Sequence, residues 1–148
     1  MQAQDTLKAK GQLTILLLNE HGNIKDRRDV DNLVVTSGLS YLASRATSSS
    51  PPTLMSHMAV GTGNTAAALG QTALVAEVGR AVMSAPSSAG GAMTFSATFG
   101  PGVGTGALTE AGIFNASSAG TMLSRTVFGT ITKAAGDSLS VTWTITLA

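Results

Sequence analysis

The sequence contains no cysteine and is poor in aromatic and charged side chains. Its 148 residues include one tryptophan, one tyrosine and four phenylalanines, and only 11% of them are charged. An ordinary globular domain carries roughly 25% charged residues. The absence of cysteine excludes disulfide bonds and thiolate metal sites, and it says little about the compartment.

The shortage of charge also excludes several kinds of partner. The net charge is +1 and no run of Lys and Arg occurs, whereas binding to nucleic-acid phosphates depends on clustered basic side chains. The longest apolar candidate, residues 13–18, is far shorter than the roughly 18 residues of a membrane span. The polar N-terminus gives no sign of a secretory signal. We therefore expect no nucleic-acid partner and no membrane.

The chain is instead rich in small side chains, because Ala, Gly, Ser and Thr make up half of it. Ten of its 17 formal charges lie between Asp5 and Asp31. The surface after residue 31 must therefore consist largely of hydroxyls, methyl groups and backbone. With 43% hydrophobic residues, the chain has enough to bury as one folded unit.

The N-terminal part predicts a β-hairpin followed by a short helix. Residues 12–19 and 24–35 have the composition of strands, and the turn between them is rich in Asn and Gly. Thr36 or Ser37 is a candidate N-cap for a helix. The apolar face of this helix is expected to comprise Leu39, Leu42, Ala43 and Ala46.

The rest of the chain predicts strands. Apolar residues alternate with Ser and Thr along 93–99 and 138–147, which is typical of half-buried strands. Further strands are expected at 54–61, 77–84, 107–115 and 121–132. The predicted fold is mainly β, an antiparallel β-sandwich or barrel with one short helix and an N-terminal β-hairpin arm. Within one compact unit, we expect a lead-in and charged hairpin arm at 1–35 and a β-sandwich domain at 36–148.

Few side chains suit catalysis or metal binding. His21 lies in a predicted turn beside Glu20, and His57 lies in a predicted strand without a nearby carboxylate, so neither predicts a zinc site. Residues 61–66 match a dinucleotide-binding fingerprint but lack the acidic residue about 20 positions later. Residues 100–106 lack the Lys of a phosphate loop. We therefore expect no enzyme activity, no catalytic residue, no cofactor and no metal.

The charged hairpin is the candidate contact region for a partner. Its basic residues neutralise its acidic ones, and strand alternation places Asp26 on the face opposite Asp29 and Asp31, which disfavours a calcium site. These charges pair either with a partner surface or with solvent. The candidate contact residues are Lys8, Lys10, Lys25, Asp26, Arg27, Arg28, Asp29 and Asp31.

Two further pairs of charges are isolated in the sequence. Glu110 and Arg125 are nearly the only charges on a predicted hairpin, so a cross-strand ion pair that fixes the strand register is expected. Glu77 and Arg80 are expected to pair with each other or across a subunit boundary. The uncharged Ser and Thr faces of the strands lack the Lys and Pro that normally protect sheet edges. We therefore expect neighbouring subunits to cover much of this surface.

Several segments resemble small virion structural proteins of tailed bacteriophages: HMAVGTG (57–63), LVAEVGR (74–80), LTEAGIFN (108–115) and GTMLSRTVF (120–128). The hairpin and NLVVTSGL (32–39) are similar to the same group, so the resemblance extends from about residue 11 to the C-terminus. The element at 109–115 also resembles one found in tail-fibre and baseplate-attached proteins.

The resemblance implies a non-enzymatic structural role in the virion, assembled in the host cytoplasm. A compact domain with a charged hairpin fits a capsid decoration, or cement, protein that binds the major capsid protein. Such a protein would be a homo-oligomer, with trimers over the junctions of shell subunits as one arrangement. The alternatives are a tail-fibre or baseplate attachment protein and a carbohydrate-binding β-sandwich. The last is weakened by the few aromatic residues, since sugar-binding surfaces favour exposed rings.

Overall fold

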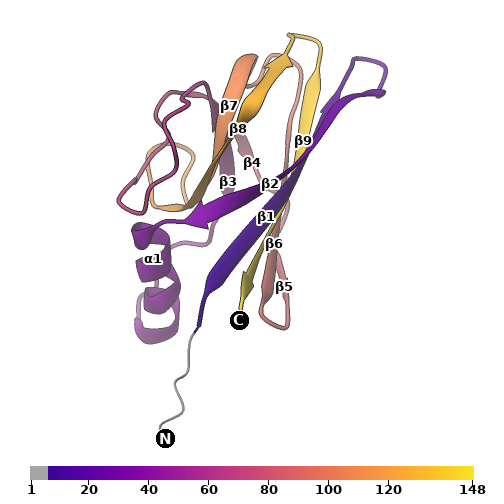
Figure 1. The fold of residues 1–148 in the computed structure, drawn as a ribbon. Helices are drawn as coiled ribbons and strands as arrows, with labels where there is room; N and C mark the ends of the chain where they lie inside the picture. The colour runs from indigo at the N-terminus through magenta and orange to yellow at the C-terminus, as the bar shows by residue number, and fades with distance from the viewer. Residues whose placement is uncertain (1–6) are drawn as a thin grey trace, which may run out of the picture.

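The structure is a computed structural model that describes residues 7–148, so the first six residues of the expected lead-in lie outside the described part. It is built from strands and one helix (Figure 1). The elements are β1 (Ala9–Leu18), β2 (Ile24–Val34), α1 (Thr36–Thr47), β3 (His57–Gly61), β4 (Glu77–Val82), β5 (Ser87–Ala89), β6 (Ala92–Phe99), β7 (Gly106–Phe114), β8 (Met122–Lys133) and β9 (Ser138–Leu147).

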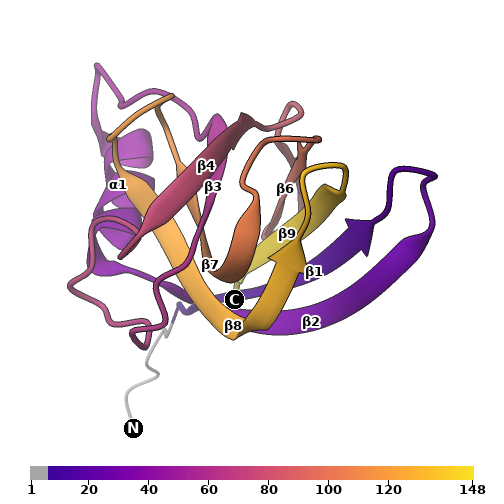
Figure 2. The same ribbon diagram turned by 90° about the horizontal axis from the view of Figure 1, so that it is seen from above.

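The strands form an antiparallel curled sheet in the order β4-β3-β7-β8-β2-β1-β9-β6-β5. Only two residue pairs join β2 to β8, Leu33 with Arg125 and Val34 with Ser124, so the sheet bends there into two layers. We call β2-β1-β9-β6-β5 the first layer and β4-β3-β7-β8 the second layer. A bridge between Met83 and Ala97 brings the far ends together, as the view from above shows (Figure 2). This confirms the predicted sandwich or barrel class.

The main core fills the space between the layers. Leu139, Val141, Trp143 and Ile145 of β9 are all at most 1% exposed, and the Ser and Thr residues between them face outward. The predicted alternation is therefore confirmed, because successive side chains of a strand point to opposite faces of the sheet. Strand β5 was not predicted; its three residues, Ser87–Ala89, carry no apolar alternation that could have identified it.

The predicted hairpin forms, but it is not a separate arm. Strand β1 pairs with β9 along its whole length and with β2 on its other side. Its apolar residues Leu13, Ile15 and Leu17 are buried in the main core. The expected boundary at residue 35 therefore runs through the main core, because residues on both sides of it are buried there together. Only the end of the hairpin near its turn extends beyond the neighbouring strands (Figure 1).

The predicted helix forms, but its N-cap and its contacts differ from those expected. Val35 occupies the N-cap position without a side-chain cap, and the Ser37 hydroxyl donates instead to the Met122 carbonyl of β8 at 3.0 Å. Leu39 is 46% exposed, whereas Tyr41 is buried. The buried face is centred on Gly38 and Tyr41 because the helix lies against β8. None of the described helices is long and apolar enough to cross a membrane.

Gly38 allows this close packing, and replacing it by alanine is expected to lower the free energy of unfolding by about 1–3 kcal/mol. A Cβ atom at this position would overlap the backbone carbonyl of Leu123, which cannot move without disturbing β8. Gly70→Ala is the matched control, because nothing lies within 4 Å of a Cβ there. Urea unfolding of both variants measures the difference; equal stabilities would contradict this packing.

Candidate functional site

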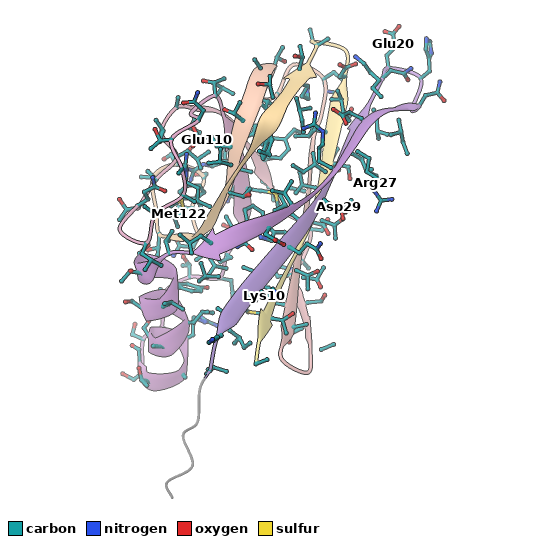
Figure 3. The ribbon with its side chains drawn as sticks, viewed as in Figure 1. Lys10, Glu20, Arg27, Asp29, Glu110 and Met122 are labelled. Atoms are coloured by element: carbon teal, nitrogen blue, oxygen red, sulfur yellow. The ribbon has the colours of Figure 1, made fainter. Side chains whose placement is uncertain are left out.

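The predicted ion pair between Glu110 and Arg125 is confirmed, and it lies at the centre of the second layer. Glu110 comes from β7 and Arg125 from the neighbouring β8 (Figure 3 labels Glu110). Arg125 Nη2 lies 2.8 Å from Glu110 Oε2, and both side chains are completely buried. In the strand register Arg125 faces Gly112 rather than Glu110, so the pair is diagonal and the glycine leaves room for the long arginine side chain.

The Glu110 carboxylate also accepts three backbone hydrogen bonds from the loop between β3 and β4. Gly63 N donates to Oε1 at 3.0 Å and Ala76 N at 2.7 Å, while Val75 N donates to Oε2 at 3.0 Å. With the two bonds from Arg125, the carboxylate has five donors. Both ends of a long loop are thus attached to one buried charge.

Arg125 attaches the middle of the same loop. Its Nη1 donates to the Thr65 carbonyl at 2.9 Å and to Gln71 Oε1 at 3.0 Å. Gln71 in turn accepts from Ala68 N and donates to the Ala66 carbonyl. Gln71 could not be identified from the sequence, because a glutamine in a loop of small residues belongs to no recognisable pattern. The ion pair and this amide together order residues 62–76.

The glycine-rich segment at 61–66 belongs to this arrangement. A Cβ at Gly61 or Gly63 would lie 2.5 or 2.7 Å from Glu110 Oε1, so glycine is required for the backbone to approach the carboxylate. Backbone N–H groups that converge on an anion are what a phosphate-binding loop also presents. Here the anion is the chain's own Glu110; Gly63 is its donor within the segment, and Val75 and Ala76 supply the other two N–H groups.

Hydrogen bonding sets the protonation state of Glu110. Burial raises the pKa of its carboxyl, but the hydrogen bonds from Ala76, Val75, Arg125 and Gly63 together outweigh this and hold the pKa below the ordinary value of 4.5. A depressed folded-state pKa contributes stability that is present above the unfolded value and is lost as pH falls through the folded one. The pair is therefore expected to stabilise the fold at neutral pH and to fail in acid.

The second predicted pair, Glu77 with Arg80, forms within the chain. Arg80 Nη2 lies 2.6 Å from Glu77 Oε1, and the Arg80 side chain is only 9% exposed, so it is not a solvated surface pair. The guanidinium stacks 4.0 Å from the ring centre of Phe114. It also donates to the carbonyls of Ala116 and Ala119. Arg80 therefore fixes the β7–β8 turn.

Most of the candidate contact charges of the hairpin are engaged within the chain. Ion pairs join Lys25 to Asp137 at 2.7 Å, Arg28 to Asp26 at 2.9 Å and Arg27 to Asp29 at 3.5 Å. Hydrogen bonds to Asp26 from Arg28, to Asp29 from Thr14 and to Asp137 from Lys25 lower the pKa of each carboxyl. Within residues 7–148 the ion pairs do not include Lys8, Lys10 or Asp31.

The predicted division of the hairpin charges between two faces is confirmed. Asp26 and Arg28 are half-buried, and Arg28 reaches the carbonyls of Gly129 and Thr130 on β8. Arg27 and Asp29 are exposed on the other face, where Figure 3 shows the Arg27 side chain reaching away from β2. Of these four charges, Arg27 and Asp29 are therefore the two that remain accessible to a partner.

A buried lysine that no sequence pattern marks lies at the end of β8. Lys133 is 1% exposed, and its Nζ donates to the Gly100 carbonyl at 2.9 Å. Burial lowers the pKa of its ammonium group, and the nearby Asp137 partly offsets this. Gly102 N also donates to the Ala135 carbonyl at 2.9 Å. These contacts join the β6–β7 loop to the β8–β9 turn, so the lysine stabilises the loops at this end of the molecule.

The outer side of the first layer forms a broad surface of hydroxyl groups. Aligned residues of β1, β9 and β6 face each other in rows, as the strand pairing shows. We call this surface the hydroxyl face; its members are Gln12, Thr14, Leu16, Ser140, Thr142, Thr144, Thr94, Ser96 and Thr98. None of these side chains is charged. Asp31, Asp29 and Arg27 of β2 lie directly beside it. Lys10 and Asp31 also line a shallow depression with Gln12, Thr144 and Thr146.

The two histidines have local partners. His21 lies in the β1–β2 turn, 3.5 Å from Glu20, and His57 Nδ1 lies 2.8 Å from the Ser56 hydroxyl. In the described part of the chain, no three His, Asp or Glu side chains come close enough to hold a metal ion.

Comparison with known proteins identifies no relative of this chain. No family model matches it, and searches of curated proteins and of solved structures find no match.

Proposed function

We propose that this chain is a non-enzymatic structural component of a tailed-phage virion, a decoration protein that binds the major capsid protein and stabilises the head. The observation that carries the proposal is the hydroxyl face, which spans three strands without a charge. Small polar side chains on a hydrogen-bonded sheet form a rigid surface that loses little side-chain entropy on binding. Depletion of charge is also typical of the core of protein interfaces.

The resemblance to phage virion proteins supports the same proposal from other residues. Besides the hairpin and residues 32–39, the segments that carry it lie on β3, β4, β7 and β8 and in the loop between β3 and β4. These elements surround Glu110 and Arg125, whose contacts hold the second layer and its loop together. In this proposal the second layer is the scaffold, and the first layer presents the hydroxyl face to the shell, with Lys10 and Asp31 at its border.

Replacing Thr142 by arginine is expected to weaken binding to undecorated capsids by about tenfold or more. Thr142 is exposed in the middle of the hydroxyl face, and burying an uncompensated charge in an interface is costly. Co-sedimentation of the purified protein with capsids assembled from the major capsid protein of the same phage measures the effect. Ser49→Arg, an equal change on the exposed loop after α1, is the matched control and is expected to bind normally.

Three outcomes would contradict the proposal. Absence of binding to capsids together with binding to purified tails would favour the alternative of a tail-fibre or baseplate protein. Unchanged capsid binding by the Thr142 variant would show that another surface makes the contact. Binding of the isolated protein to a glycan array would instead support the carbohydrate-binding alternative.

A further inference from the structure

An apolar cavity of about 300 Å³ opens between α1 and β5, which lie at the same end of the molecule (Figure 1). Its apolar wall consists of Leu42, Leu54, Met55, Met93, Phe95 and Leu123. Met55, Phe95 and Leu123 also belong to the buried main core. The cavity therefore reaches from the surface to the core between the two layers. Its size is at the lower end of the range for small-molecule sites, and the mouth of a β-barrel is one of their usual places.

The polar side chains that line the cavity surround its mouth. Arg45 of α1 and both Ser87 and Ser88 of β5 are lining residues, and all three are exposed. Arg45 Nη1 donates to the Pro52 carbonyl at 2.7 Å, which holds the guanidinium beside the opening. Among the described residues, no acceptor contacts its Nε or Nη2 atoms. These two donors are therefore available to a ligand.

Arg45 also has no acidic partner in the described part of the chain. The acidic residues that follow residue 31 are Glu77, Glu110 and Asp137, and each forms an ion pair with another cation. None of the described residues that line the cavity is acidic. The cavity thus combines an apolar interior with a single unpaired positive charge at its mouth. The ligand that complements it has an aliphatic body and one anionic end.

We propose that this cavity binds a small aliphatic carboxylate of medium chain length. The hydrocarbon chain lies against the apolar wall between the two layers, and the carboxylate accepts hydrogen bonds from Arg45 Nε and Nη2. A guanidinium matches a carboxylate with two parallel hydrogen bonds. One cation suits a singly charged carboxylate better than a doubly charged phosphate ester. The proposal does not depend on the proposed role in the virion.

Titration of the full chain with hexanoate, octanoate and decanoate, followed by NMR of the methionine methyl groups, tests the site. Met55 and Met93 line the cavity and are expected to shift, whereas Met58, Met83 and Met122 lie outside its lining and are expected to stay in place. Each added methylene is expected to tighten binding about fourfold until the cavity is filled. Octylamine, whose positive end faces Arg45, is expected not to bind.

The variant Arg45→Gln tests the contact with the carboxylate. It is expected to weaken octanoate binding at least about tenfold and to leave the binding of neutral octanol unchanged, which shows that the cavity itself is intact. Arg27→Gln is the matched control, because it removes the same charge from an exposed side chain on the hairpin. It is expected to bind octanoate as the wild type does.

Several results would overturn the proposal. One is the absence of any shift at Met55 and Met93 up to decanoate, and another is an equal shift of all five methionines, which would indicate non-specific binding. Octanoate binding that is unchanged by Arg45→Gln would exclude the proposed contact. Tighter binding of octyl phosphate than of octanoate would show that the site is not made for a carboxylate.

Discussion

Replacing Arg125 by methionine is expected to lower the free energy of unfolding by about 3–5 kcal/mol. The substitution removes the only side-chain cation within hydrogen-bonding distance of Glu110 among the described residues and leaves a carboxylate that is completely buried. It also releases the Thr65 carbonyl and Gln71. Chemical denaturation at neutral pH measures the loss, and amide hydrogen exchange across residues 62–76 is expected to accelerate most.

A control variant and an acid titration provide further tests of the Glu110–Arg125 pair. Arg45→Met replaces an exposed arginine and is expected to change stability by no more than about 0.5 kcal/mol. Glu110→Gln removes the titrating group, so its stability is expected to fall less steeply than that of the wild type as pH drops below about 4.5. A loss under about 1 kcal/mol for Arg125→Met would contradict a structural role for the pair.

Deleting residues 1–31 is expected to prevent folding altogether. The deletion removes β1, which carries the fully buried Leu13 and Ile15 and lies between β2 and β9 in the sheet. Without it, the edge of β9 and the apolar face of Trp143 are exposed. The near-ultraviolet circular dichroism signal of the single tryptophan is expected to disappear. The truncated protein is also expected to show no cooperative thermal unfolding. A protein with the same deletion cannot therefore be used to test the hairpin as a docking arm.

Changes confined to the turn of the hairpin are expected to be harmless by comparison. His21→Ala alters an exposed side chain whose partner, Glu20, is itself exposed, so the folded signal and the midpoint of unfolding are expected to persist. A cooperatively folded fragment that begins at residue 36 would contradict the integration of the hairpin. It would restore the two-part organisation that the clustering of charge suggests.

The strands of this fold are accessible from sequence because each signal is local. Alternation of apolar and hydroxyl residues along β6 and β9 identifies both the strand and its buried face. The isolation of Glu110 and Arg125 on one predicted hairpin was also enough to predict their pairing. A buried charge in a chain with little charge requires a partner, and few candidates existed.

The contacts that organise the site depend on residues distant in sequence. The three backbone donors to Glu110 come from a loop more than 30 residues away, and no periodic pattern marks them. Gly38 and Gln71 also belong to no sequence pattern that would indicate their roles. Their roles arise only from what lies against them, the carbonyl of Leu123 in one case and the guanidinium of Arg125 in the other.

The sequence by itself determined that this protein has no thiol chemistry, few charges and an outer surface of small hydroxyl side chains, because composition and alternation depend only on the order of residues. The tertiary structure alone decided where the charged hairpin lies. Apolar residues on β1 are buried in the main core, so the hairpin lies in the middle of the sheet, and the sheet curves where β2 and β8 pair over only two residues. Burial and curvature are properties of the assembled sheet, which no segment encodes alone.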